Sequence, residues 1–131
     1  MDAQLDRRGL WWLLGLLMVA VVLHLSLMPA PPEPLAFAHA DKLEHGVTFA
    51  WLALWFLQIA PRHALAVMAA LLVLGVGIEI AQSFTPTRSP EAADVVADAL
   101  GLVFGARLAA TRAGRLLITL ERRLDGWRML A

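Results

Sequence analysis

The chain has 131 residues, of which 60% are hydrophobic and 17% charged, and its mean hydropathy is +0.67. An ordinary soluble domain is about half apolar with about a quarter of its residues charged, so this composition favours a membrane protein. The formal net charge of zero argues against a bulk nucleic-acid binder. The absence of cysteine excludes disulfides and thiolate metal sites. The length predicts a single domain, residues 1–131.

Residues 10–28 form an apolar run in which His24 and Ser26 are the polar side chains. A helix of that length spans about 28 Å at about 1.5 Å per residue, close to the thickness of a bilayer core. Trp11 and Trp12 lie where an interfacial aromatic belt is expected. We therefore predict a transmembrane helix. The alternative is a cleaved signal peptide, but its apolar region is shorter, about 7–15 residues.

Three further apolar runs are separated by proline-containing segments. Residues 29–34 contain four prolines, which cannot continue a helix, and residues 85–90 form a second proline-marked turn. Each run must include its polar residues to approach the roughly 30 Å of a bilayer core. We predict transmembrane helices at about 43–60, 63–84 and 92–110, which gives an all-α bundle of four transmembrane helices.

Arginine and lysine set the predicted orientation. With the N-terminus inside, the cytoplasmic segments hold nine of the 11 basic residues, and Lys42 and Arg88 lie outside. This predicts an N-in/C-in topology with the polar residues of the spans on the extracytoplasmic side. In residues 112–131, leucines recur at helical spacing opposite arginines, which predicts a basic amphipathic helix on the inner leaflet. A helix that binds a soluble partner is the alternative.

Polar side chains share one face of each of the last three predicted spans, at spacings of three or four residues. We predict that they form a ligand-binding cluster of Lys42, His45, Glu79, Gln82, Arg88, Asp94 and Asp98. Gly101 and Gly105 continue the face that carries the two aspartates, and their spacing predicts close helix packing.

One ordered set of residues is specific: Asp-Lys-x-x-His at 41–45, Glu-x-x-Gln at 79–82, then Arg88, Asp94, Asp98 and Gly101. Its order and spacing over residues 41–105 resemble the VanZ-like family of small polytopic bacterial membrane proteins. Asp98 stands where that family usually has asparagine, and Glu91 where a small or hydroxyl residue is common. The extra carboxylate at Asp98 makes the site more acidic, which favours a bound cation or a protonated acid.

The resemblance implies a cell-envelope protein of the bacterial cytoplasmic (inner) membrane. The founding member of the family is linked to resistance to the glycopeptide teicoplanin. Antibiotic resistance, and a partner that is a lipid-linked cell-wall precursor or a glycopeptide, are therefore implied in addition to membrane lipids.

Three hypotheses explain ionisable residues inside a bilayer, where a charge costs about 3 to 15 kcal/mol. In the first, Lys42, Arg88 and His45 bind the anionic headgroup of a lipid, and the three acidic residues orient them. In the second, the protein is a metal-dependent hydrolase or transferase. No cofactor is predicted, but a divalent metal such as Mg²⁺ or Mn²⁺ is left open, with the ligands His45, Glu79, Asp94 and Asp98.

In the third hypothesis, the polar residues form a purely structural network that holds the helices together. Transport is less favoured, because no internal repeat is visible and four helices would have to oligomerise to line a path. A homo-oligomer is left open.

Overall fold

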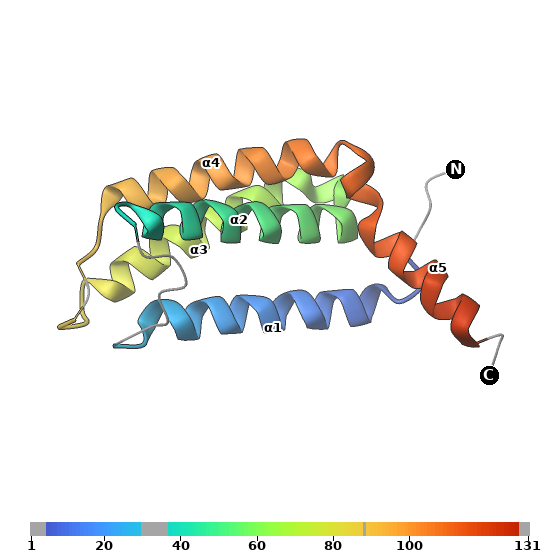
Figure 1. Cartoon of the computed structure of the whole chain (residues 1–131), viewed down its shortest axis with the longest axis horizontal. Coiled ribbons are helices and arrows are strands. Elements are labelled where there is room, and N and C mark those ends of the chain that lie inside the picture. The colour runs from blue at the N-terminus through green and yellow to red at the C-terminus, as the bar shows by residue number, and fades with distance from the viewer. Residues whose placement is uncertain (1–4, 30–36, 88, 129–131) are drawn as a thin grey trace.

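The computed structural model describes residues 5–29, 37–87 and 89–128, and these contain helices and no strand. The elements are α1 (Arg8–Leu27), α2 (Ala40–Ile59), the short 3-10 helix η1 (Pro61–His63), α3 (Ala64–Gln82), α4 (Ala92–Ala109), the 3-10 helix η2 (Arg112–Arg115) and α5 (Leu116–Arg128). Helices α1 to α4 lie side by side as a bundle, and α5 leaves one end of it at an angle (Figure 1). The prediction of an all-α fold is confirmed.

The helix boundaries follow from local chemistry. Helix α2 ends at Ile59 because Pro61 cannot supply a backbone N–H, and the N–H of Ala60 closes the last turn on the carbonyl of Phe56 at 2.9 Å. Its start at Ala40 is three residues earlier than predicted. Asp41 and Lys42 therefore lie on the first turn of the helix.

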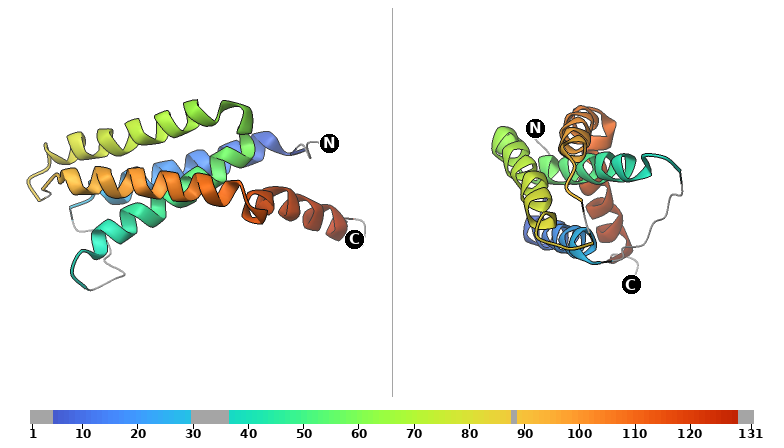
Figure 2. Two further views of the ribbon diagram at one scale, coloured as in Figure 1. Left: turned by 90° about the horizontal axis from the view of Figure 1, so that it is seen from above. Right: turned by 90° about the vertical axis from the view of Figure 1, so that its left-hand side faces the viewer.

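Helix α2 is the centre of the bundle. It packs against α1, α3 and α4, and its side chains Phe49, Leu52 and Ala53 are among the most buried in the protein. Figure 2 shows it crossing the other helices when the bundle is viewed from above. Burying a phenylalanine or leucine side chain contributes about 1.5–3 kcal/mol, so the contacts of α2 hold the other helices in place.

Glycines allow α2 and α4 to approach closely. A Cβ atom added to Gly101 would lie 2.2 Å from the carbonyl oxygen of Gly46, and one added to Gly105 would lie 2.2 Å from that of Ala50. Both distances are far shorter than a van der Waals contact, so only glycine fits at these two positions of α4.

In the described parts of the chain, two helices are long and apolar enough to cross a membrane, as judged by length and composition: α1 and the 22-residue stretch Pro61–Gln82, which joins η1 to α3. Many of their large apolar side chains are exposed, among them Leu13, Leu16 and Val73. Helices α2 and α4 carry more charged residues, at positions 41, 42 and 44 and at positions 94, 98 and 107, whereas α1 carries Arg8 and the stretch Pro61–Gln82 carries Arg62 and Glu79.

Helix α5 is attached to the start of α1 by a buried carboxylate. Glu121, which is 2% exposed, accepts hydrogen bonds from the backbone N–H groups of Asp6 (2.9 Å) and Arg7 (2.8 Å) and from the indole of Trp11 (2.6 Å). Arg7 also forms an ion pair with Asp125. The assignment of Trp11 to an interfacial belt is therefore wrong, because Trp11 is buried between Glu121 and the ring of Trp55.

The surface of α5 is only partly what the amphipathic pattern of residues 112–131 predicts. Leu117 is fully buried, and its backbone N–H donates to the side-chain oxygen of Gln58 on α2 at 2.9 Å. Leu120 and Leu124 are exposed, as are the arginines at 112, 115, 122 and 123. One leucine thus anchors the helix to the bundle, while the other two remain accessible.

Candidate functional site

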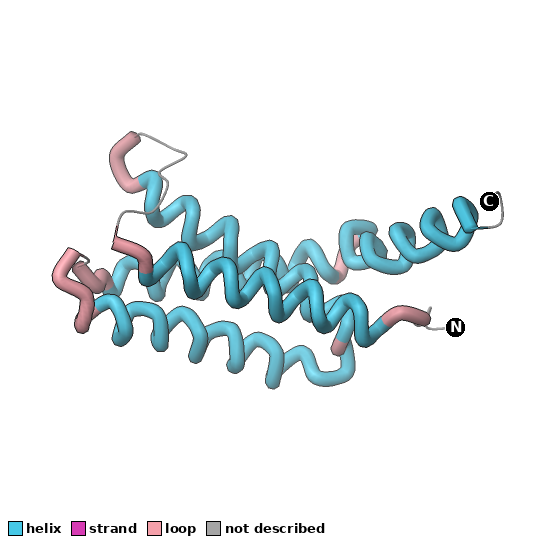
Figure 3. The backbone as a smooth tube through the Cα atoms, turned by 90° about the horizontal axis from the view of Figure 1, so that it is seen from below, coloured by secondary structure: helices cyan, strands magenta, loops and turns pink. Residues whose placement is uncertain are grey.

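Three helix ends meet at one end of the bundle: the start of α2, the end of α3 and the start of α4. Figure 1 shows these helix ends at the end of the molecule opposite α5, and Figure 3 shows loops at that same end, away from the two termini. Most of the residues predicted to bind a ligand lie there. We call the group formed by Asp41, Lys42, His45, Glu79, Glu91, Asp94 and Asp98 the polar centre.

Lys42 is surrounded by carboxylates. Its Nζ donates to Asp41 Oδ2 at 2.9 Å, to Glu91 Oε2 at 2.6 Å and to Asp94 Oδ1 at 3.0 Å. An ammonium group has three donors, so all three are used. The side chains of Asp41 and Glu91 are 55% and 51% exposed, whereas that of Asp94 is 10% exposed. One partner of Lys42 is therefore buried, and two face the surroundings.

His45 and Asp98 form a second pair. Nδ1 of His45 lies 2.9 Å from Oδ1 of Asp98, whose side chain is almost completely buried. The other oxygen of Asp98, Oδ2, is buried and has no hydrogen-bond partner among the described residues. A Cβ added to Gly75 would lie 2.5 Å from that oxygen, so the glycine on α3 makes room for the carboxylate.

Glu79 connects the end of α3 to the start of α4. Its Oε2 accepts the backbone N–H of Glu91 at 2.9 Å, which satisfies a donor that precedes the first turn of α4. Its Oε1 is buried and finds no partner within the described parts of the chain. The site thus contains two buried carboxylate oxygens, one on Glu79 and one on Asp98, without a described partner.

Of the two remaining predicted site residues, one has a partner outside this group. The side-chain amide of Gln82 donates to the backbone carbonyl of Ser26 at 2.9 Å and so ties α3 to the end of α1. Arg88 lies outside the described residues. Counting only described side chains, the polar centre has five carboxylates against Lys42 and the imidazole of His45, so it is acidic.

Among the described residues, two sets of side chains lie close enough together to be candidate ligands of a metal ion. One ligand atom each from His45, Glu79 and Asp94 lies within 4.8 Å of the others, and the same is true of Asp41, Glu91 and Asp94. The first set contains three of the four residues predicted as metal ligands. The fourth, Asp98, binds the imidazole of His45.

Asp41 and Glu91 were missed as site residues. Asp41 is adjacent to Lys42 on the first turn of α2, which is a usable signal in the sequence. Glu91 is 49 residues from Lys42, and only the packing of α2 against α4 brings the two side chains together.

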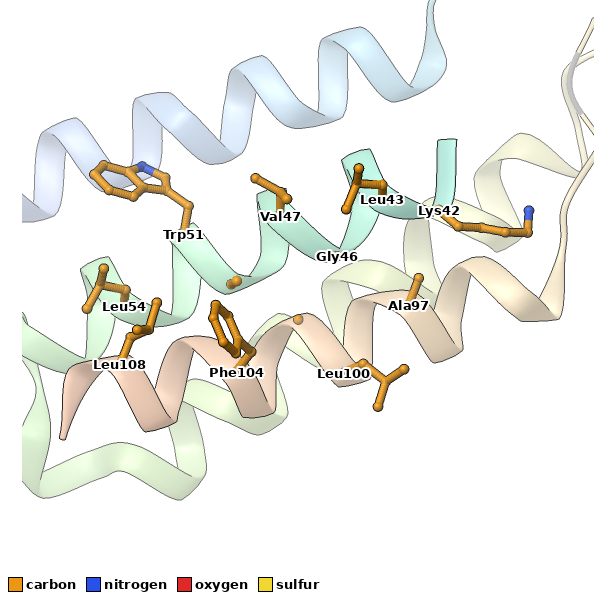
Figure 4. Close-up of a pocket in the computed structure, with 12 residues that line it drawn as sticks. Lys42, Leu43, Gly46, Val47, Trp51, Leu54, Ala97, Leu100, Phe104 and Leu108 are labelled. Carbon is orange, nitrogen blue, oxygen red and sulfur yellow. The ribbon is translucent and has the colours of Figure 1, made fainter. Parts of the chain in front are cut away.

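An apolar groove runs from the polar centre along α2 and α4 (Figure 4). It encloses about 630 Å³, and the residues that bound it include Val47, Trp51, Leu100 and Phe104. Lys42 is the one charged residue among those that line it, and it lies at one end. The arrangement is a long apolar groove with Lys42 at one end.

Comparison of the chain with protein-family models, with curated proteins and with solved structures gives no match.

Proposed function

We propose that this chain is a multi-pass membrane protein that binds an anionic lipid. The headgroup would lie at the polar centre, and one hydrocarbon chain would lie in the groove between α2 and α4. The observation that carries the proposal is the groove itself, because its walls are apolar along their length and the charged residue that bounds it, Lys42, is at its end. An anionic lipid has a matching arrangement, with an apolar hydrocarbon chain and a charged group at its end.

The proposal places all four helices of the bundle across the membrane. Helices α2 and α4 have 20 and 18 residues, which correspond to about 30 and 27 Å at about 1.5 Å per residue. They pack alongside the two helices that are apolar enough to span by themselves. The distribution of arginines then supports an N-in/C-in topology, with the polar centre towards the outer face.

An anion can reach Lys42 because two of its three partners are exposed. Exposed ion pairs are worth only about 0–1 kcal/mol, so a phosphate oxygen can displace Asp41 or Glu91 at little cost. The buried partner, Asp94, would keep the lysine side chain in place. Exchange of one carboxylate for one phosphate leaves every donor of Lys42 satisfied.

The experiment is to measure binding of phosphatidylglycerol to the purified full chain in detergent, by native mass spectrometry. Lys42→Gln should weaken binding about tenfold, because it removes the cation that would make charge-assisted hydrogen bonds to the phosphate. Val47→Phe should also weaken it by filling the groove. Arg62→Gln, at the opposite end of the bundle, and Val73→Phe, on the exposed face of α3, are matched controls.

The proposal is wrong if Lys42→Gln and Val47→Phe bind phosphatidylglycerol as tightly as the unmodified chain. That result would favour the structural network, which is supported by the complete use of the Lys42 donors. A structural role predicts instead that Lys42→Gln lowers the melting temperature with no dependence on lipid. The hypothesis of a metal-dependent hydrolase or transferase needs a divalent ion at the same centre.

The resemblance to the VanZ-like family extends the proposal to the bacterial cell envelope. There the lipid would be a lipid-linked cell-wall precursor, and the chain would affect resistance to glycopeptides. Expression of the chain in a susceptible bacterium should raise the teicoplanin concentration needed to stop growth. The Lys42→Gln variant, expressed at the same level, should not.

A further inference from the structure

The polar centre contains two groups of potential metal ligands, and one of them already surrounds a cation. Asp41, Glu91 and Asp94 form the first group. Nζ of Lys42 lies within hydrogen-bonding distance of all three, at 2.6–3.0 Å. The ammonium group therefore occupies the position that a metal ion would take, and this group of acids has its counter-ion.

The second group consists of His45, Glu79 and Asp94. Among the described residues, no cation contacts all three, and of the three Lys42 bonds to Asp94 alone. Glu79 is 7% exposed, and its Oε2 accepts the backbone N–H of Glu91. Its Oε1 has no hydrogen-bond partner in the described chain. A buried carboxylate oxygen without a partner is costly and rare, so it indicates a missing cation or donor beside Glu79.

Asp98 gives His45 the orientation of a metal ligand. With Asp98 ionised, its oxygens only accept hydrogen bonds, so the contact with Oδ1 is made by the tautomer of His45 that carries its proton on Nδ1. Nε2 then carries the lone pair that a metal requires. A histidine held by a buried carboxylate through its other nitrogen is the usual support of a metal-binding imidazole.

Asp94 can serve both groups. Its Oδ1 accepts from Lys42, which leaves Oδ2 for another partner. His45, Glu79 and Asp94 come from three different helices. A bound ion would therefore connect α2, α3 and α4 at the end of the bundle opposite α5.

We propose that His45, Glu79 and Asp94 bind one divalent cation of the Mn²⁺ type, with Asp98 as the residue that positions His45. Mixed imidazole and carboxylate ligands suit manganese and zinc better than calcium. The ligand atoms lie within 4.8 Å of one another. Metal–ligand bonds of about 2.1 Å place neighbouring ligand atoms roughly 3–4 Å apart, so small side-chain rotations complete the site. Three protein ligands leave coordination positions open to water or to a phosphate oxygen.

Metal binding by His45, Glu79 and Asp94 would not require a bound lipid. A bound cation would offset the excess of carboxylates at the polar centre, and it would do so whether or not a headgroup is present. Metal binding can therefore be measured on the delipidated chain, and its failure would leave the test of lipid binding unaffected.

The test uses the full chain in detergent, treated with a chelator and then titrated with Mn²⁺ alone, with electron paramagnetic resonance used to measure the free ion. We expect one bound Mn²⁺ per chain. Glu79→Gln should weaken binding at least tenfold, and Asp98→Asn should weaken it about 10- to 100-fold, as loss of a supporting carboxylate does at other metal sites. The bound ion in the unmodified chain should also show hyperfine coupling to one imidazole nitrogen, and His45→Gln should abolish that coupling.

Two further variants change carboxylates that lie near the proposed metal site but are not among its ligands. Glu44→Gln changes the acid next to His45, which belongs to neither group, and Glu91→Gln changes the first group while keeping the backbone N–H that Glu79 accepts. Glu44→Gln should bind Mn²⁺ as the unmodified chain does, and Glu91→Gln should weaken binding less than Glu79→Gln does.

Three results would each overturn the proposal: an unmodified chain that binds no Mn²⁺, a bound ion without nitrogen coupling, or a loss of affinity in Glu91→Gln that is absent in Glu79→Gln. The nitrogen coupling is measured on the unmodified chain, so it decides the question even if a variant fails to fold.

Discussion

Glu121 offers the sharpest test of how α5 is held to the bundle. Its carboxylate accepts two backbone N–H groups at the start of α1 and the indole N–H of Trp11. Glu121→Gln keeps the shape of the side chain but removes its charge and one acceptor oxygen. The change therefore weakens these bonds without creating a large cavity.

The magnitude follows from the bonds that are lost. Charge-assisted hydrogen bonds are roughly twice as strong as neutral ones, and a buried donor left without an acceptor costs about 1–3 kcal/mol. The bond from Trp11 is buried, whereas those from Asp6 and Arg7 are partly buried and can be replaced by water. We expect Glu121→Gln to lower the free energy of unfolding by about 1–3 kcal/mol at neutral pH.

The stabilisation that Glu121 contributes should depend on pH, because folding changes the pKa of its carboxyl. Burial acts to raise the pKa of Glu121, but the hydrogen bonds from Trp11, Arg7 and Asp6, together with the charge of Arg7, outweigh it and hold the pKa below its ordinary value of 4.5. A carboxyl whose pKa is lowered by folding stabilises the folded state fully above its unfolded pKa. That stabilisation is lost as the pH falls below about 4.5 and passes through the lower pKa of the folded state.

The assay is thermal unfolding of the chain in detergent between pH 7 and pH 3, followed by tryptophan fluorescence. The difference in melting temperature between the unmodified chain and Glu121→Gln should be largest at neutral pH and should shrink below about pH 4.5. Glu44→Gln, on α2 away from this anchor, is the control for other carboxylates. A difference that stays constant down to pH 3 would show that the charge of Glu121 does not hold α5 in place.

Two further substitutions test the packing of the helices. Gly101→Ala should lower the melting temperature because its Cβ would meet the carbonyl oxygen of Gly46. The control is Gly77→Ala on α3, whose Cβ meets nothing within 4 Å and which should stabilise the helix by about 0.5–1 kcal/mol. Equal stability of the two variants would contradict the close contact between α2 and α4. Gln58→Leu removes the acceptor of the buried Leu117 N–H and should speed hydrogen exchange at that amide, while Gln58→Glu, which keeps an acceptor, should change it much less. Unchanged exchange in Gln58→Leu would mean that this bond does not attach α5 to α2.

The polar centre was predictable in part. Periodicity placed Lys42 and His45 on one face of a helix, and Glu79, Asp94 and Asp98 on the faces of two others, because helical neighbours are three or four residues apart. The same reasoning could not tell which partner each one takes. Lys42 contacts Glu91 and Asp94 across 49 and 52 residues, and Gln82 turns instead to the backbone of Ser26.

The excess of carboxylates at the polar centre could be recognised only from the tertiary structure. Glu91 appears in the sequence as one more charged residue in a loop, although its side chain binds Lys42 and its N–H binds Glu79. Likewise Gly75 reads as a small residue on an apolar helix, but it leaves the space that the buried oxygen of Asp98 occupies. Such contacts depend on how three helices are rotated about their axes, which periodicity alone leaves open.

By itself, the sequence determined that the chain is helical and where its helices break, because long apolar runs and prolines act locally on the backbone. It also determined which residues are too polar for a hydrocarbon environment and therefore require partners. Tertiary structure alone decided that Lys42 is the cation for three carboxylates, that Glu79 and Asp98 keep buried oxygens beside His45, and that Glu121 fastens α5 to α1. These are contacts between distant segments, fixed by close packing of α2 against α4 and of α5 against α1, and no local pattern of residues encodes them.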